Sequence, residues 1–184
     1  MRSRIFAAIG MALAGWLAVA PAARADSAAE IARDARAALA ELTAENAAAR
    51  ALAAEAKAVL VFPDIVKVGL LVGGQGGEGA LIRDGQIAGY YRTTAASFGL
   101  QAGVQKFGYV LFFMSDQALT YLDRSDGWEL GVGPSIVVVD EGVARNVTTT
   151  TLRSDVYAFI FDQKGLMAGM GLQGTKVSRF SPSR

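Results

Sequence analysis

The sequence predicts a mainly β protein of the α+β class, in which a strongly twisted antiparallel sheet or partial barrel has N-terminal α-helices packed on it. Residues 26–57 are rich in alanine and have a helical period, whereas residues 58–184 consist of short apolar runs separated by turn dipeptides. Glycine recurs on one face of several runs, for example at 166–174, and favours bends, barrel corners or close approach of two backbones. Together these patterns favour one domain built mainly on a sheet.

The N-terminal segment, residues 1–25, has the pattern of a cleaved secretory signal peptide. A basic start precedes an apolar stretch at 5–20, and residues 23–25 (Ala-Arg-Ala) supply the small-x-small pattern that signal peptidase reads. The apolar stretch is short for a spanning helix, which needs roughly 20 residues; a retained anchor is the alternative. We therefore expect a periplasmic or secreted mature chain, residues 26–184, with peripheral association with a membrane.

Removal of that segment changes the charge of the chain. It takes Arg2, Arg4 and Arg24 from the 18 basic residues and leaves 15 against 17 acidic ones, a net charge of −2. No strong electrostatic footprint for nucleic acid remains, and attraction to an anionic surface has to come from a local patch. Cysteine is absent, which excludes disulfides, a thiol nucleophile and a lipidated N-terminal cysteine.

Two helices, or one kinked helix, are expected before the sheet. Ser27 and Glu30 form a capping-box pattern, in which each side chain satisfies a free backbone N–H at the start of a helix. One apolar stripe follows at spacings of four, four and three residues: Ile31, Ala35, Leu39 and Leu42. Thr43 is predicted to break the helix and to cap a second one.

The first strand is expected at 59–62, where Pro63 would stop it. Asp84 and Gly85 form the dipeptide of a two-residue type I′ hairpin, because both central residues of that turn need positive φ. Further turns are expected at two places: 126–127 and 164–165.

One interior helix is predicted over 115–122, with Ser115 or Asp116 as its N-cap. Two other runs, 107–114 and 136–139, are apolar at consecutive positions. Strands that are buried on both faces have this pattern.

Residues 74–79 contain a literal G-x-G-x-x-G. The segment that follows, 80–85, predicts a strand entering a hairpin rather than a helix N-terminus, so a glycine turn or bulge is favoured over a dinucleotide site.

Catalytic chemistry has few residues to use in this chain. Histidine and cysteine are both absent, which excludes Ser–His and Cys–His activation and the usual zinc sites. The closest acidic groupings lie beside turn glycines and lack the apolar surroundings that acid–base chemistry needs: Asp123 with Asp126, and Asp140 with Glu141. We expect no enzyme, no catalytic residue, no metal and no cofactor; a carboxylate-based hydrolase lacks an evident acid/base pair.

The two faces of the strand expected at 97–105 differ. One face is apolar (Phe98, Leu100, Ala102, Val104), and the other consists of glycine and glutamine (Gly99, Gln101, Gly103, Gln105). The second face is too bare for an ordinary core and too uncharged for an ordinary solvated surface. It therefore indicates a β scaffold that presents a surface.

Basic residues lie in or beside the glycine-rich strands and hairpins: Lys67, Arg83, Arg92, Lys106 and Lys164. Several are close in sequence to aromatic residues: Tyr90, Tyr91, Phe107 and Tyr109. Rings at headgroup depth with cations at the phosphates are typical of an interfacial lipid site. The alternative is that these are scattered charges that favour solubility.

Five motifs occur in the order found in a known family: 56–63 (Ala-Lys-x-Val-Leu-Val-Phe-Pro), 73–79 (the glycine cluster), 97–103 (Ser-x-Gly-Leu-Gln-Ala-Gly), 128–132 (Trp-Glu-Leu-Gly-Val) and 165–174. Over roughly residues 52–180 the chain resembles the SYLF family of lipid-binding domains, here in an exported bacterial branch. The resemblance implies a β-rich domain that binds phospholipid headgroups, and in eukaryotic relatives phosphoinositide and actin binding. It also implies lipid contacts by a basic N-terminal segment, which acidic residues dilute here.

We therefore expect a non-enzymatic phospholipid-binding protein of the bacterial cell envelope, which associates reversibly with membrane surfaces through headgroup contacts. The candidate lipid-binding residues are Lys57, Lys67, Arg83, Arg92 and Lys106. The alternative is a structural or protein-interaction module of the envelope, whose Gly/Gln-rich strand face docks a protein partner.

Overall fold

The computed structural model of the chain describes residues 26–69, 72–98, 103–124, 127–139, 154–165 and 174–183. The predicted signal segment, Asp126 and the acidic pair at 140–141 lie outside these residues. The elements in chain order are α1 (Ala28–Glu45), α2 (Ala47–Glu55), β1 (Ala58–Gly69), β2 (Val72–Arg83), β3 (Gln86–Phe98), β4 (Gly103–Phe113), α3 (Asp116–Leu122), β5 (Trp128–Glu129), β6 (Ile136–Val138), β7 (Val156–Gly165) and β8 (Lys176–Phe180).

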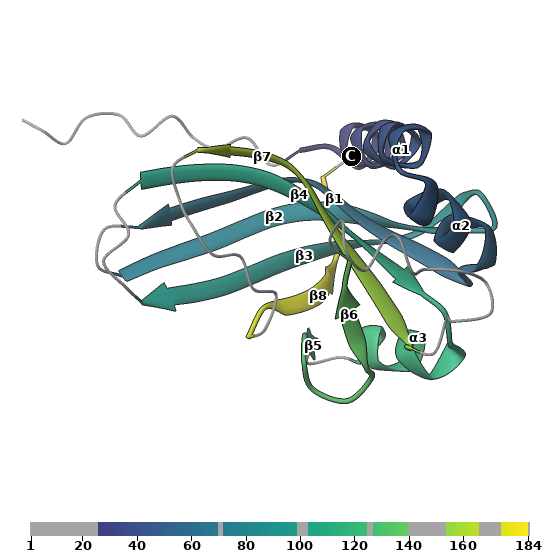
Figure 1. Cartoon of the computed structure of the whole chain (residues 1–184). Helices are drawn as coiled ribbons and strands as arrows, with labels where there is room; N and C mark the ends of the chain where they lie inside the picture. Colours follow the sequence, from purple (N-terminus) through teal and green to yellow (C-terminus); the bar gives the residue numbers. More distant parts are fainter. Residues whose placement is uncertain are drawn as a thin grey trace, which may run out of the picture.

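Eight strands form one sheet in the order β5-β8-β3-β2-β1-β4-β7-β6. Every neighbouring pair is antiparallel except β6 and β7, which are parallel. The sheet curls strongly, as a half-barrel does (Figure 1). It has an inner face that packs on α3 and β5 and an outer face that packs on α1 and α2. The predicted fold class is confirmed.

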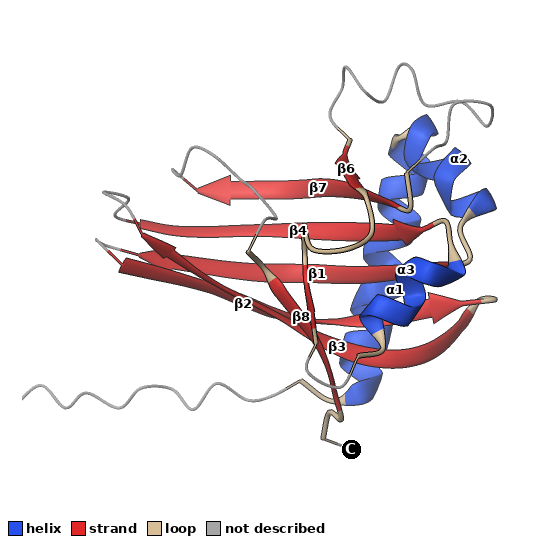
Figure 2. Cartoon of the chain, turned by 90° about the horizontal axis from the view of Figure 1, so that it is seen from below, coloured by secondary structure: helices blue, strands red, loops and turns tan. Residues whose placement is uncertain are grey.

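The helices lie near one end of the long strands. Figure 2 shows them gathered on the right, while β1 to β4 extend beyond them to the left. We call this extension the distal half of the sheet. It comprises 64–69 of β1, 72–78 of β2, 92–98 of β3 and 103–108 of β4.

The start of α1 has the predicted capping box. The backbone N–H of Ser27 donates to Glu30 Oε2 at 2.9 Å, and Ser27 Oγ accepts from the backbone N–H of Glu30 at 3.3 Å. The predicted stripe faces the sheet: Ile31 and Ala35 are buried, and Leu39 and Leu42 are partly buried against the same core. Local patterning therefore correctly predicts both the start and the buried face of this helix.

The prediction of a break at Thr43 is wrong, because the break lies at Asn46. Asn46 Oδ1 accepts from the backbone N–H groups of Ala48 and Ala49, both at 3.0 Å, and so caps α2. Thr43 Oγ1 instead donates to the carbonyl of Leu39 at 2.9 Å inside α1. Threonine can make this backward bond within a helix, whereas asparagine is among the preferred N-cap residues.

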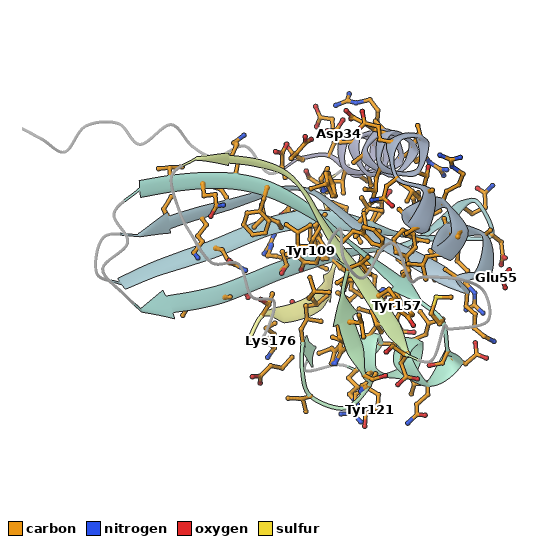
Figure 3. All side chains as sticks on the ribbon, viewed as in Figure 1. Asp34, Glu55, Tyr109, Tyr121, Tyr157 and Lys176 are labelled. Atoms are coloured by element: carbon orange, nitrogen blue, oxygen red, sulfur yellow. The ribbon has the colours of Figure 1, made fainter. Side chains whose placement is uncertain are left out.

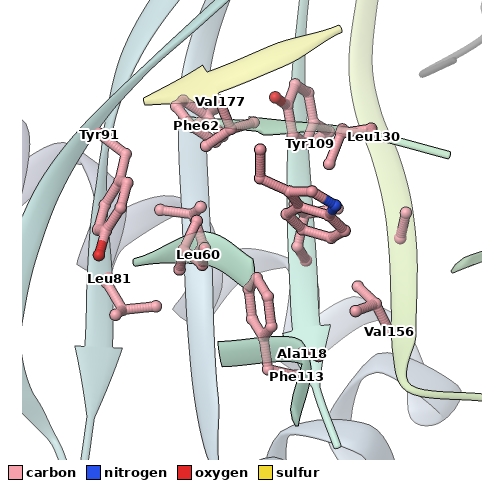
Figure 4. Close-up of a cluster of buried hydrophobic side chains, with 14 of the residues drawn as sticks. Leu60, Phe62, Leu81, Tyr91, Tyr109, Phe113, Ala118, Leu130, Val156 and Val177 are labelled. Atoms are coloured by element: carbon pink, nitrogen blue, oxygen red, sulfur yellow. The ribbon is translucent and has the colours of Figure 1, made fainter. Parts of the chain in front are cut away.

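Two hydrophobic cores lie on opposite faces of the same strands. In the inner core, Phe62 and Tyr109 are in ring contact at 4.8 Å between centroids, and Phe113 contacts Trp128 at 5.8 Å (Figure 4). In the outer core, residues of α1 and α2 pack on alternate positions of the strands, among them Val59, Val61, Val110 and Phe112. β4 is therefore buried on both faces along 107–113, as predicted.

β1 does not stop at Pro63, contrary to prediction. It continues to Gly69 through a register shift that falls between Val61 and Asp64 against β2, and between Phe62 and Ile65 against β4. Proline is tolerated at such a bulge because no ladder N–H is required there.

The neighbours of this bulge are glycines. A Cβ atom on Gly77 would collide with the backbone oxygen of Asp64, and one on Gly79 would collide with that of Val61. On the other side, a Cβ on Gly108 would lie 2.8 Å from the carbonyl oxygen of Pro63. The predicted close approach of backbones therefore occurs around the β1 bulge, and residues 74–79 form a strand, not a phosphate-binding loop.

The other predicted turns have mixed outcomes. Asp84 (φ 50°) and Gly85 (φ 73°) form the β2–β3 hairpin as expected. Gly127, with φ 83°, has a turn conformation. The turn expected at 164–165 is wrong, because these residues continue β7 opposite Lys106 and Gln105.

The second predicted two-sided strand and the Trp128 run also differ from expectation. β6 lies at the edge of the sheet, and Val138 is exposed, so 136–139 is not buried on both faces. β5 contains only Trp128 and Glu129, because the chain turns immediately afterwards.

The predicted helix over 115–122 is confirmed as α3, with Ser115 as its N-cap. One carboxylate ties this cap to the start of β7 and to the residue before β6. Asp155 Oδ1 accepts from Ser115 Oγ at 2.8 Å, and its Oδ2 accepts from the Oγ and N–H of Ser135 at 2.9 and 3.1 Å. These hydrogen bonds from Ser115, followed by those from Ser135, lower the pKa of Asp155 below its ordinary 3.8.

Replacement of Gly77 or Gly79 by alanine is expected to lower the free energy of unfolding by about 1–3 kcal/mol, because the added methyl group would push β1 away. Gly74→Ala is the matched control in the same strand, since its Cβ would lie 3.7 Å from the nearest atom, Ala95 O. Urea unfolding followed by circular dichroism measures all three. Equal stability of Gly77→Ala and Gly74→Ala would contradict the close approach.

Asp155→Asn is expected to lower the free energy of unfolding by about 1–3 kcal/mol near neutral pH, because a hydrogen-bonded carboxylate is lost. A depressed folded-state pKa stabilises the protein fully above the unfolded value of 3.8, and this contribution is lost as pH falls through the folded pKa. The difference in free energy of unfolding between Asp155→Asn and wild type should therefore become smaller below about pH 4. Asp64→Asn, at an exposed carboxylate, is the control; a pH-independent difference for Asp155→Asn would contradict the assignment.

Candidate functional site

The five predicted lipid-binding cations do not form one site. Lys57, just before β1, pairs with Asp116 of α3 at 2.6 Å. Arg83 lies at the end of β2 beside the hairpin, and its side chain is exposed. Arg92 and Lys106 lie on the outer face of the distal half, whereas Lys67 lies on the inner face.

Arg92 and Lys106 line an outer groove together with four carboxylates: Asp26, Asp34, Asp64 and Glu78. Arg92 is bound to Glu78 at 2.7 Å and stacks over Phe180 at 4.8 Å, and Lys106 lies 3.9 Å from Asp64. With four acidic groups against two basic ones, this groove is not an enclosed phosphate site, although the side chain of Lys106 is 58% exposed and can extend to a surface outside the groove.

The inner face of the distal half contains a row of polar residues beyond the hydrophobic core. Lys67 stands directly opposite Gln75 of β2 and Gln105 of β4, so the three side chains point to the same face. Lys67 is 8% exposed and Gln105 is 2% exposed. Two further buried residues lie close to this row: Thr93, opposite Gly77 of β2, and Thr175, which is hydrogen-bonded to Gln75. We call these five residues the inner polar cluster: Lys67, Gln75, Thr93, Gln105 and Thr175.

Two members of the inner polar cluster lack partners. Gln75 Nε2 donates to Thr175 Oγ1 at 3.4 Å, and the buried hydroxyl of Tyr109 donates to Thr93 Oγ1 at 2.7 Å. Burial raises the pKa of Tyr109 well above its ordinary value, so its phenol remains a neutral donor. By contrast, Gln105 Oε1 is buried without a hydrogen bond, and Lys67 makes no hydrogen bond or ion pair within the described residues.

The outer face of the distal half carries three exposed valines beside its charged pairs. Val66, Val68 and Val104 are 37%, 48% and 61% exposed, and Val68 is directly opposite Val104. Val66 and Val68 are also opposite Gly76 and Gly74, which leave the sheet without side chains on that side. Lys106, opposite Val66, places a cation at the border of these valines. We call the three valines the outer valine patch.

Two sequence predictions about these strands need correction. The Gly/Gln face was expected to be presented, but Gln105 points inward and is buried, whereas Val104 points outward; Gln101 lies outside the described residues. The aromatic residues expected at a lipid interface are mostly internal, because Tyr91, Phe107 and Tyr109 belong to the inner core.

Sequence reasoning selected Lys67 but as a surface cation, and it missed Gln75 and Thr175 altogether. The alternation of Val66, Lys67 and Val68 was the available signal, since it places the lysine on the face opposite two valines. Only the curl of the sheet decides that the lysine side is the buried one.

Of the acidic groupings noted in the sequence, the described part of the chain contains Asp123. Asp123 accepts a hydrogen bond from the Tyr91 hydroxyl at 2.9 Å and lies 3.7 Å from Arg179. No group of three or more His, Cys, Asp or Glu residues that could hold a metal ion is found among the described residues. None of the three helices described is both long and apolar enough to span a bilayer.

Residues 94–181 match the model of the Ysc84 family, described as Las17-binding protein actin regulator. The match runs from the end of β3 to just beyond β8 and includes Gln105 and Thr175. It confirms the resemblance to the SYLF family for this part of the chain. A search of curated proteins finds no match.

The burial of Lys67 predicts low chemical reactivity. In the folded protein, an amine-acetylating reagent should modify the exposed Lys57 and Lys106 to completion while Lys67 stays largely unmodified. In urea all three should react alike, and mass spectrometry of peptides measures each site. Acetylation of Lys67 at the rate of Lys106 in the folded protein would contradict its inward orientation.

Proposed function

From the SYLF-type match at residues 94–181, we propose that this chain is a non-enzymatic phospholipid-binding protein that associates reversibly with membrane surfaces. The single observation that carries the proposal is the outer valine patch with Lys106 at its border. Apolar side chains that enter the headgroup region, next to a cation that meets phosphate, are the combination that holds a protein at a membrane surface.

The expected free energy of membrane binding fits reversible association. Full burial of a valine side chain is worth about 1.5–3 kcal/mol, and the three valines are already partly buried in the protein, so each gains less. A lysine near an anionic surface adds about 1 kcal/mol. The total is a few kcal/mol, which corresponds to a peripheral contact rather than to permanent insertion.

We place this function in the bacterial cell envelope. The support is the signal-peptide pattern of residues 1–25, which would deliver residues 26–184 to the periplasm or the exterior. Cleavage after Ala25 would leave the protein without a lipid anchor, since the chain has no cysteine.

The second candidate is a protein-interaction module of the envelope. It is favoured by the description of the matched family, which names a protein partner and actin regulation. The same outer valine patch would then dock a protein rather than a bilayer.

Liposome co-sedimentation of residues 26–184 tests the proposal. We expect binding to anionic vesicles that weakens as salt rises, and weaker binding to zwitterionic vesicles. The double variant Val68→Glu/Val104→Glu should bind about tenfold more weakly or worse, because two apolar contacts become charges repelled by the membrane.

The matched control is Val132→Glu/Val138→Glu, which adds the same charge at valines that are 55% and 44% exposed away from the patch. It should bind as wild type does. Equal loss in both double variants would attribute the effect to net charge alone. Absence of binding by wild type to either vesicle would overturn the lipid proposal and favour a protein partner.

A further inference from the structure

The inner polar cluster holds a cation that nothing in the described chain neutralises. Lys67 is 8% exposed and has no acidic or hydrogen-bonding partner among the described residues. Burying an unpaired ammonium is unfavourable relative to leaving it in water. If this position had only a structural role, a neutral side chain such as those of Gln75 and Gln105 would cost less desolvation free energy than a lysine.

The charge is also isolated by the sheet itself. The inner-face rows around Lys67, as given by the register, are Phe107–Ile65–Gly77–Thr93 on one side and Gly103–Gly69–Gly73 on the other. None of these residues is acidic. Asp64 and Glu78, the nearest acids along β1 and β2, point to the outer face, where they pair with Lys106 and Arg92. Within the described residues, no acidic side chain of β1 or β2 faces Lys67.

A second unsatisfied group stands next to the first. Gln105 is 2% exposed, and its Oε1 has no hydrogen-bond donor. A buried unpaired acceptor costs about 1–3 kcal/mol. Because Gln105 and Lys67 are directly opposite each other, their Cβ atoms are about 4.5–5.5 Å apart. The two unpaired groups therefore lie side by side on the same face of the sheet.

The row beyond the cluster consists of glycines. Gly69, Gly73 and Gly103 are neighbours in that row, and Gly165 lies opposite Gln105. None of them carries a side chain beside Lys67 or Gln105. Larger residues at these positions would place side chains against the unpaired groups.

We propose that the inner polar cluster binds a phosphate group that carries a neighbouring hydroxyl or amine. Lys67 binds the phosphate, and Gln105 Oε1 accepts a hydrogen bond from the hydroxyl or amine. Glycerol phosphate and phosphoethanolamine have both features, whereas phosphocholine has the phosphate but no N–H or O–H donor. The proposal deepens the proposed function by naming the headgroup chemistry, but it concerns the inner face rather than the outer valine patch.

The test titrates the folded protein with four soluble probes by calorimetry: glycerol 3-phosphate, phosphoethanolamine, phosphocholine and inorganic phosphate. Wild type should bind the first two several-fold more tightly than the last two. Lys67→Gln should weaken binding of the first two at least tenfold, whereas Lys67→Arg retains it. Arg33→Met, which removes an equal charge from an exposed position of α1 on the outer side of the sheet, is the matched control and should bind as wild type does.

Gln105→Leu separates selectivity from charge. This variant should keep phosphate binding but lose the preference for phosphoethanolamine over phosphocholine. If Lys67→Gln does not fold, the loss of preference in Gln105→Leu tests the proposal on its own. Binding unchanged by Lys67→Gln, an unchanged preference in Gln105→Leu, or no binding of any probe by wild type would overturn the proposal.

Vesicles containing phosphatidylethanolamine, phosphatidylglycerol or phosphatidylcholine identify the source of the phosphate. A lipid source predicts that the preference seen with soluble probes recurs on vesicles and is lost in Lys67→Gln. A soluble phosphoester as the natural ligand predicts the preference in solution only. Val68→Glu/Val104→Glu should lose vesicle adsorption yet still bind soluble probes, so failure of the membrane proposal is distinguishable from failure of the inner site.

Discussion

The bulge at Pro63 and Asp64 is the constraint on which the rest of the sheet depends. At this point β1 presses its backbone against Gly77 and Gly79 of β2 and Gly108 of β4, with no room for a side chain. Bulges increase local twist and bend the strand that contains them. On the helical side of the bulge both faces of β1 are buried in hydrophobic cores; on the far side the burial of β1 alternates, with Lys67 inward and Val66 and Val68 outward.

This division reverses the usual arrangement of an amphipathic sheet in the distal half. Ordinarily the covered face is apolar and the exposed face is polar. Here the inner face carries a lysine, two glutamines and two threonines, while the outer face carries three exposed valines and two glycines beside the pairs Arg92–Glu78 and Lys106–Asp64. Both departures cost stability for the isolated chain, because charge is buried and apolar surface stays in water. Proteins retain such costs mainly where they bind something. The two contacts proposed above, a bilayer at the outer valine patch and a headgroup at the inner polar cluster, would each use one of the two faces.

Sequence patterns predicted those parts of the fold that are decided by a few adjacent residues. The Ser27–Glu30 capping box, the Asp84–Gly85 hairpin and the Ser115 cap depend on local hydrogen bonds or local φ values, and all three are confirmed. Pro63 was misjudged because a bulge is visible only when the partner strands are known. The break at Thr43 was misplaced because two acceptable caps lie three residues apart. The sequence offered Lys67 as a candidate, but not its burial. That burial depends on the curl of the sheet and on a partner strand, β4, whose Gln105 lies more than thirty residues further along the chain.

The position of Trp128 has a practical consequence for how the folding of this protein can be followed. The chain has two tryptophans, Trp16 and Trp128, so residues 26–184 contain Trp128 alone. Its indole is buried against Phe113 in the inner core and donates to the carbonyl of Val132 at 2.9 Å, whereas the outer core is formed with α1 and α2. Intrinsic fluorescence therefore reports on one side of the sheet and helical circular dichroism mainly on the other. Because both cores share β1 and β4, coincidence of the two signals during denaturation measures how tightly the sheet couples them.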